Sequence, residues 1–264
     1  MILDYITWNV DPELIGFWII SIRYYGVLFA ASFFFGYLIM QKMFKKENLP
    51  IELLDNLTIY MAIGTVLGAR LGHCFFYQPE YYLRNPWEIL FIWHGGLASH
   101  GAAIGILIAL YYFGKKNKKP YLWILDRIVI VVALAGFFIR MGNLMNSEIY
   151  GIETSLPWGF IFVRDGQIVP KHPTQIYEAL SYLIIFVVLL LIYSKKGKQL
   201  KQGLLFGIFL ISLFTVRFFI EFIKEVQVDF ETGMSLNMGQ WLSIPFILVG
   251  IFLLFRSFWQ PQIK

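Results

Sequence analysis

Residues 176–193 read IYEALSYLIIFVVLLLIY, and residues 194–201, SKKGKQLK, follow at once. The first stretch carries one charge, Glu178, near its start. A helix rises 1.5 Å per residue, so about 20 apolar residues cross a hydrocarbon core of about 30 Å. The second stretch holds four lysines within eight residues. A long apolar helix that ends in clustered lysines indicates a membrane span whose end meets the lipid headgroups.

The same pattern recurs along the whole chain. Of its 264 residues, 58% are hydrophobic and only 15% are charged, and the mean hydropathy is +0.64, which is outside the range of ordinary soluble domains. We predict an all-α integral membrane protein, with residues 1–264 forming a single transmembrane domain. The seven expected spans lie near residues 17–40, 57–76, 97–113, 121–141, 176–193, 204–224 and 241–257.

The basic residues predict the orientation of these spans. Lysines crowd the linkers after the first, third and fifth spans, and Arg256 and Lys264 lie in the C-terminal tail. The opposite linkers hold only Arg84, Arg164 and Lys171. Cytoplasmic loops carry the excess of Lys and Arg, so the N-terminus is expected outside and the C-terminus in the cytoplasm. An odd number of spans agrees with this arrangement.

The remaining composition narrows the class of partners and cofactors. The net charge of +5 comes from short lysine runs between apolar segments, which favours membrane orientation over nucleic-acid binding. Cys74 is the only cysteine, and four scattered histidines lack metal-ligand spacing, so we expect no metal site. Trp87 and Trp93 lie near span ends, where tryptophans commonly anchor a protein at the lipid interface, although simple packing is an equal alternative.

The linker 142–175 is too long for a simple turn. Phe160-Ile161-Phe162-Val163 and Ile168-Val169 have strand-like composition and flank Asp165-Gly166, a dipeptide that favours a hairpin turn. We therefore expect a small folded cap outside the membrane, because long loops in compact proteins are usually functional.

Six basic residues fall within or at the edges of predicted spans: Arg23, Arg70, Arg127, Arg140, Arg217 and Lys224. A central charge costs about 2.5–3.5 kcal/mol to insert, so such residues usually face a protein interior or a water-filled cavity. Snorkelling to the interface is the alternative, and for Arg23, Arg127 and Lys224 both remain open. Arg217 and Glu221 share one helix face, which is compatible with a structural ion pair. Arg140 and Arg217 together also suit a phosphate, because guanidinium groups match phosphate oxygens bidentately.

A glycine-rich stretch precedes the third span: His94-Gly95-Gly96-Leu97-Ala98-Ser99-His100-Gly101-Ala102. Glycines at a helix start let the backbone approach a ligand closely. His100 is a candidate general base, because imidazole exchanges protons near neutral pH. A histidine among glycines is, however, also a common structural hydrogen-bonder.

Residues 140–151, RMGNLMNSEIYG, resemble the R-x-G-N-x-x-N-x-E-x-x-G signature of the prolipoprotein diacylglyceryl transferases. Further stretches resemble this family in the same order: Ile22 to Gly26, Gly68 to Gly72, Gly95 to Gly101, His172 to Glu178 and Arg217 to Glu221. The family also has seven spans with the N-terminus outside. After Glu221 the sequence lacks the proline expected of the family within 224–227, so the last outer loop departs from the pattern.

The resemblance implies an enzyme of the bacterial cytoplasmic (inner) membrane that acts toward the outer leaflet. It implies transfer of the diacylglyceryl group of phosphatidylglycerol to the lipobox cysteine of a prolipoprotein signal peptide, with release of glycerol 1-phosphate. Arg140, His100 and Arg217 are then the expected catalytic residues. The expected substrate-binding residues are Arg140, Asn143, Asn146, Glu148, Gly151, Tyr25, Arg70, Glu221 and Glu178.

Two other classes of protein also place polar residues in membrane spans. A lipid or anion transporter (flippase) would also place arginines in spans, but it predicts repeat symmetry and broken helices, which the sequence does not indicate. An intramembrane protease needs paired aspartates or a serine and histidine within spans, and Asp126 is the only aspartate inside a predicted span.

Overall fold

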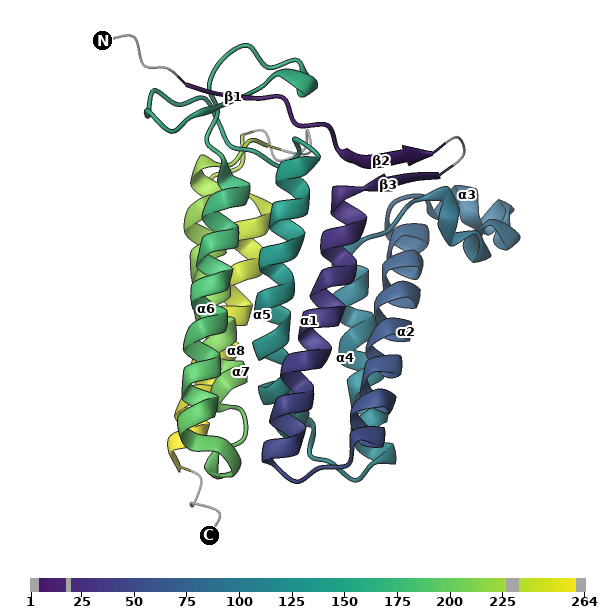
Figure 1. Cartoon of the computed structure of the whole chain (residues 1–264), viewed down its shortest axis with the longest axis vertical. Helices are drawn as coiled ribbons and strands as arrows, with labels where there is room; N and C mark the ends of the chain where they lie inside the picture. The colour runs from purple at the N-terminus through teal and green to yellow at the C-terminus, as the bar shows by residue number, and fades with distance from the viewer. Residues whose placement is uncertain (1–4, 18–19, 227–232, 260–264) are drawn as a thin grey trace. The chain divides into compact units, whose positions relative to one another are not determined.

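A computed structural model describes residues 5–17, 20–226 and 233–259 of the chain (Figure 1). The chain divides into two compact units, residues 1–39 with 126–264 and residues 40–125. Gln227 and Lys264, to which sequence predictions were attached, lie outside the described residues.

The first unit holds the strands and most of the long helices. Its elements are β1 (Ile6–Trp8), β2 (Glu13–Phe17), β3 (Ile20–Arg23), α1 (Tyr24–Lys46), α5 (Tyr121–Met145), β4 (Phe160–Phe162), η3 (Val163–Asp165), α6 (Thr174–Lys196), η4 (Gly197–Gln199), α7 (Leu204–Ile220), η5 (Glu221–Ile223) and α8 (Met238–Trp259). The second unit holds α2 (Ile51–Phe76), α3 (Pro79–Arg84), η1 (Pro86–Leu90), η2 (Ile92–His94) and α4 (Ser99–Lys116). Helices α1 and α5 each cross from one unit into the other.

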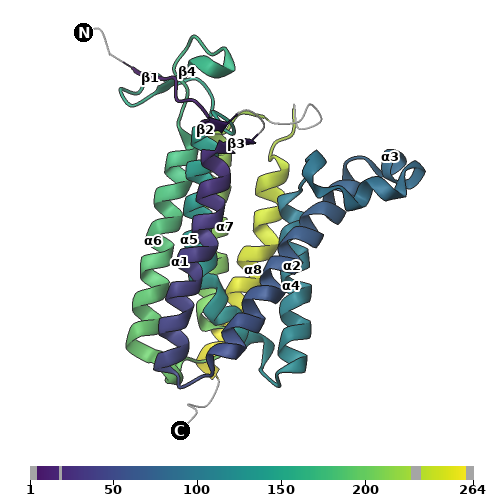
Figure 2. The same cartoon turned by 45° about the vertical axis from the view of Figure 1, so that its right-hand side comes forward.

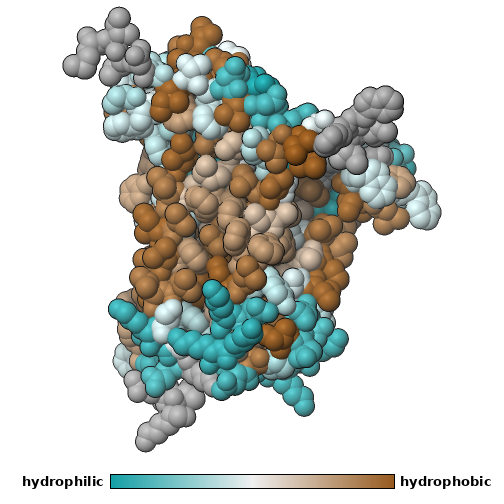
Figure 3. Space-filling view, in the orientation of Figure 1, coloured by the Kyte–Doolittle hydropathy of each residue, from teal (hydrophilic) through white to brown (hydrophobic). Residues whose placement is uncertain are grey.

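The described chain is mostly helical, as expected of an all-α membrane protein. Among the described residues, six helices are long and apolar enough to cross a membrane: α1, α2, α5, α6, α7 with η5, and α8. Hydrophobic side chains cover the left-hand edge of Figure 3, where α6 lies in Figure 1, and α6 ends with Lys195 and Lys196 in its last turn. Helix α4 forms at the third predicted span, 97–113, but it contains His100, Lys115 and Lys116, which lower its hydropathy, and it is not among these six. A seventh span stays a prediction.

The predicted start of the first span, residue 17, is wrong. Residues 20–23 form β3, which pairs antiparallel with β2, and α1 begins only at Tyr24. The sequence Ile-Ser-Ile-Arg alternates apolar and polar residues, which is the period of a strand. Arg23 lies opposite Glu13 in this hairpin, so it is not a residue of a spanning helix.

A small cap forms where the N-terminal strand β1 meets the connection between α5 and α6. Strand β1 pairs in parallel with β4, and Trp8 donates its indole N–H to the Leu144 carbonyl at 3.0 Å. Leu144, Tyr150, Phe160 and Phe162 form its buried core. The predicted hairpin partner, Ile168-Val169, is wrong: Phe160 pairs instead with Lys171, because η3 and the left-handed Gly166 lengthen the turn.

Asp126, the aspartate predicted within a span, caps the N-terminus of α7. Its carboxylate accepts the N–H groups of Gly203 at 2.6 Å and Phe206 at 2.9 Å. These groups begin α7 and have no partner within that helix. A buried carboxylate on α5 thus satisfies the N-terminus of α7, where negative charge is favoured.

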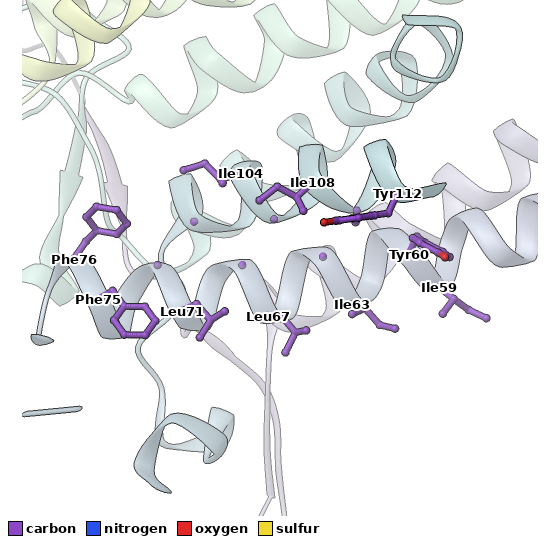
Figure 4. Close-up of a pocket in the computed structure, with 16 residues that line it drawn as sticks. Ile59, Tyr60, Ile63, Leu67, Leu71, Phe75, Phe76, Ile104, Ile108 and Tyr112 are labelled. Atoms are coloured by element: carbon purple, nitrogen blue, oxygen red, sulfur yellow. The ribbon is translucent and has the colours of Figure 1, made fainter. Parts of the chain in front are cut away.

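In the second unit, α2 and α4 lie side by side and touch through glycines (Figure 2). A Cβ added at Gly72 would lie 2.6 Å from the Gly101 Cα, and one at Gly105 would lie 2.7 Å from the Gly68 Cα. Small residues allow such close backbone contact between spanning helices. Beside this contact lies an apolar groove of about 770 Å³, with Leu67 and Ile108 among the side chains in Figure 4.

Candidate active site

The centre of the site is Arg140, near the C-terminal end of α5. Its Nε lies 2.7 Å from Oε2 of Glu178, which is fully buried in the first turns of α6. Its Nη1 donates to the Asn143 side-chain oxygen at 3.1 Å. The guanidinium therefore holds a fixed orientation between two helices, with only 13% of the side chain exposed.

Glu178 connects Arg140 to a second set of charges. Lys224 lies 3.6 Å from its Oε1 and 3.2 Å from Oε1 of Glu221. Arg217 lies 3.5 Å from the same Glu221 oxygen. In these ion pairs three cations share two carboxylates, so the cluster carries excess positive charge. Arg217 is its most accessible cation, with 34% of the side chain exposed.

The signature loop continues from Arg140. Asn143 donates to Glu148 Oε1 at 2.8 Å, and Asn146 donates to the same oxygen at 3.2 Å. Ser147 and Ile149 both adopt positive φ, 55° and 62°. A β-branched residue in this region is strained, and such strain persists only where surrounding contacts enforce it.

The start of α6 supplies those contacts. Thr174 donates its hydroxyl to the Ile149 carbonyl at 2.9 Å, and Gln175 donates its amide to the Glu148 carbonyl at 2.7 Å. Both side chains are fully buried. Two stretches that resemble the family, 140–151 and 172–178, therefore meet in space and fix one another.

Two glycines explain the close packing around the loop. A Cβ at Gly151 would lie 2.8 Å from the Cβ of His172 and would overlap the Ile223 carbonyl, so the backbone passes where no side chain fits. A Cβ at Gly142 would lie 2.7 Å from the ring of Tyr25, which places this ring of α1 directly on the signature helix. Tyr25 also interacts electrostatically with Glu148 and Arg140.

A polar cavity of about 390 Å³ opens beside the loop. Its lining residues are Asn146, Ser147, Glu148, Ile149, Tyr150, Asp165, Glu225 and Val226. The side-chain oxygens of Asn146 and Ser147 are buried and have no hydrogen-bond partner among the described residues. Unpartnered buried acceptors are costly, so this cavity suits a ligand that brings hydrogen-bond donors.

One wall of this cavity is a hydrogen-bonded tyrosine. Tyr150 donates its hydroxyl to Asp165 and accepts from Gln167 at 2.8 Å. Burial, together with Asp165, raises the pKa of Tyr150 well above its ordinary value. The phenol therefore stays protonated and keeps the Asp165 carboxylate in place at neutral pH.

The second unit contains the other two predicted site residues. His100 begins α4 and contacts the rings of Tyr77 and Phe76, with centroids 5.6 and 6.0 Å away. Arg70 is buried, with 2% exposed, and its guanidinium donates to the carbonyls of Glu88, Ile89 and Gly95. Their roles toward a substrate stay predictions, and the hydrogen bonds of Arg70 support a positioning role.

Within the first unit, the structure gathers the predicted Arg140, Asn143, Asn146, Glu148, Gly151, Glu178, Arg217, Glu221 and Tyr25. Sequence reasoning left Lys224 between snorkelling and an interior position, and the structure places it inside, 8% exposed. It missed Asn237, which donates to Glu221 Oε2 at 3.1 Å. The three-residue spacing of Glu221 and Lys224 could have predicted the ion pair that accompanies the interior position of Lys224. No local signal links residue 237 to residue 221.

The arrangement can bind an anion and stabilise charge that grows on it. Arginines in a low-dielectric, preorganised site interact strongly with phosphate oxygens. Within the residues that the structure describes, no three His, Cys, Asp or Glu side chains gather closely enough to hold a metal ion. The fold and the site together define a membrane-embedded protein with a shaped, cationic site.

The comparisons with known proteins identify the family. The prolipoprotein diacylglyceryl transferase family matches over residues 12–256, and the chain belongs to this family of transferases. A phosphatidylglycerol–prolipoprotein diacylglyceryl transferase of Chloroherpeton thalassium is 47% identical over 99% of this chain and 97% of that protein. Proteins of the same name from Tolumonas auensis and Bacteroides fragilis are 49% and 44% identical, each over 95% of this chain and over 96% and 94% of their own lengths.

Proposed function

We propose that this chain transfers the diacylglyceryl group of phosphatidylglycerol to the lipobox cysteine of a prolipoprotein. The observation that carries this proposal is the cluster in which Arg140, Arg217 and Lys224 share the fully buried Glu178 and the partly buried Glu221, beside a polar cavity. The cations suit the phosphate of the donor lipid. The unpartnered oxygens of Asn146 and Ser147 suit the hydroxyl groups of its glycerol headgroup.

In the proposed reaction, the cysteine sulfur attacks the glyceryl carbon that bears the phosphate. A carbon–sulfur bond forms, the carbon–oxygen bond breaks, and the electron pair leaves with glycerol 1-phosphate. Negative charge grows on the phosphate as this bond breaks, and donors aimed at that charge stabilise the transition state more than the ground state. Arg140 and Arg217 supply these donors.

The thiol must lose its proton for this attack. A cysteine with a pKa of about 8.5 is only slightly ionised at neutral pH, so a nearby base or positive field accelerates the reaction. His100 is the proposed base, and the arginine cluster supplies the field. Glu178 and Glu221 position the cations and take no proton. The reaction requires no metal or organic cofactor.

The proposed setting is the bacterial cytoplasmic (inner) membrane, crossed seven times, with the N-terminus and the cap outside. Lysines at the ends of α1, α4 and α6 support a cytoplasmic position for these ends. The signature loop lies at the opposite end of α5 from that set of linkers. The site then works toward the outer leaflet, where a prolipoprotein signal peptide presents its lipobox.

The test is reconstitution of the purified protein in phosphatidylglycerol vesicles with a synthetic lipobox peptide. We expect a thioether-linked product and an equal amount of glycerol phosphate. Arg217→Gln should abolish most of this turnover, whereas Arg164→Gln, which removes an exposed ion pair with Asp11 in the cap, should retain it. A folded wild-type protein that forms neither product would refute the proposal.

A further inference from the structure

Residues 77–94 of the second unit form an arm between two long helices. The arm begins where α2 ends at Phe76 and continues through α3, η1 and η2. Only four residues, 95–98, separate its end from α4. Figures 1 and 2 show α3 extending sideways from the end of α2.

One side of the arm is fastened to its own unit. Tyr82 is buried, and the Arg70 guanidinium lies 5.1 Å from the centre of its ring. Arg70 also donates to the carbonyls of Glu88 and Ile89 in η1. The buried Arg70 thus supplies hydrogen bonds to carbonyl groups of η1 that have no partner in a strand or a long helix. The arm therefore has a fixed inner side.

The other side presents large apolar side chains. Leu83 is 72% exposed, Trp87 75% and Leu90 63%. Glu80 and Arg84, also exposed, lie among them. Contiguous leucine and tryptophan side chains this exposed are rare on soluble proteins and usually mark a surface that binds a partner or a membrane. The mixture of apolar, tryptophan and charged residues is that of segments which lie in a lipid–water interface.

The position of the arm next to α2 indicates that lipid covers its apolar side. Helix α2 is long and apolar enough to cross a membrane, and its last two residues, Phe75 and Phe76, are 50% and 71% exposed. The apolar side of the arm begins seven residues after Phe76 and thus continues the lipid-facing surface of α2. Three residues of chain span at most about 11 Å, so α3, which starts at Pro79, lies close to the end of α2.

We infer that this arm is an interfacial membrane anchor, with Leu83, Trp87 and Leu90 inserted among the headgroups and upper acyl chains of the adjacent leaflet. Arg70 holds the arm rigidly on α2, so the lipid surface fixes the depth of the Gly95–Gly96 turn before α4. The inference concerns contact with lipid and does not depend on the reaction proposed above.

The test places a fluorescent probe at single positions of the full chain. Cys74 is fully buried and can remain unlabelled. Trp87→Cys and Leu90→Cys are labelled with an environment-sensitive dye in nanodiscs of phosphatidylglycerol and phosphatidylcholine. Ile168→Cys, at an 88% exposed position of the cap, is the matched control. Retention of the thermal unfolding midpoint shows that each variant folds.

Lipids brominated at the upper acyl carbons should quench both arm probes strongly and the control weakly, while aqueous iodide should do the reverse. Quenching of the arm probes by iodide alone would overturn the inference. A second result would also overturn the inference: both quenchers fail to reach the arm probes, and this protection is lost when each nanodisc holds one chain. A second copy of the chain, and not lipid, would then cover the arm.

Discussion

Glu178 is the carboxylate that compensates the charges of Arg140 and Lys224. It has no exposed surface, and it lies against Arg140 on one side and Lys224 on the other. A buried ion pair gives little net stability, but removal of one partner leaves an uncompensated buried charge. Glu178 therefore stabilises the cations of the site, and those cations are then available to a phosphate.

We expect Glu178→Gln to destabilise the protein by about 3–5 kcal/mol, the range for breaking a buried pair. Thermal unfolding in detergent measures the effect. Glu153→Gln is the control, since this carboxylate is 70% exposed and lies 3.8 Å from Lys171, and its loss should cost less than about 1 kcal/mol. Equal midpoints for the two variants would show that Glu178 does not compensate the cluster.

Arg140 uses the shape of its guanidinium as well as its charge. Its Nε and Nη1 bind Glu178 and Asn143 at the same time. Lysine keeps the charge but has no planar fork. Arg140→Lys should lower kcat by about 10²-fold or more, in the range for loss of one preorganised donor. Turnover with saturating phosphatidylglycerol measures it, and unchanged kcat would argue against a shaped phosphate site.

At the level of the elements, buried side chains of helices hold the irregular segments between helices in place. The start of α6 binds the strained loop after α5 through Thr174 and Gln175. In the second unit, Arg70 of α2 binds the carbonyls of η1 and of the Gly95 turn. In both cases buried side chains of a helix satisfy the backbone of an irregular segment, which a membrane protein requires near the lipid.

Arg70→Ala should release the arm from α2. Its loss leaves several buried carbonyls without donors and should cost about 3 kcal/mol, as for hydrogen bonds to a charged group. Hydrogen exchange of residues 86–96 should become faster, while exchange in α6 should not change. Arg84→Ala, at an exposed position of α3, is the matched control. Unaltered exchange in 86–96 would contradict the positioning role.

At the scale of the whole molecule, orientation in the membrane decides where the candidate site works. The lysines of the last turns of α1, α4 and α6 favour the cytoplasmic side for these ends. The cap, with β1 and β4, then lies outside. An acceptor peptide that reaches the outer leaflet could meet the signature loop only in this orientation.

Single cysteines test this orientation. In intact cells, a membrane-impermeant maleimide should label Ile168→Cys in the cap and should not label Lys116→Cys at the end of α4. Permeabilised cells should show labelling of both, because both positions are exposed. The reverse pattern would place the site toward the cytoplasm and contradict the proposed setting.

Local patterns predicted each long helix of the described residues, and the stretches that resemble the family contain Arg140, Glu178, Arg217 and Glu221 of the cluster. The errors came where the pairing of strands decides the structure. Ile20 to Arg23 pair with β2 instead of starting α1, and Phe160 pairs with β1 and Lys171 instead of Ile168-Val169. Strand pairing depends on which segments meet, and hydropathy carries no such information.

Hydropathy and charge are properties of local sequence, so they are sufficient to predict the class of the protein, its apolar helices and the residues that carry its charge. Only the tertiary structure decided that Lys224 lies inside, that Glu178 joins it to Arg140, and that Asn237 binds Glu221. In each of these pairs the two partners lie at least 16 residues apart along the chain. Packing of α5, α6 and α7 brings them together, and burial then makes their pairing obligatory.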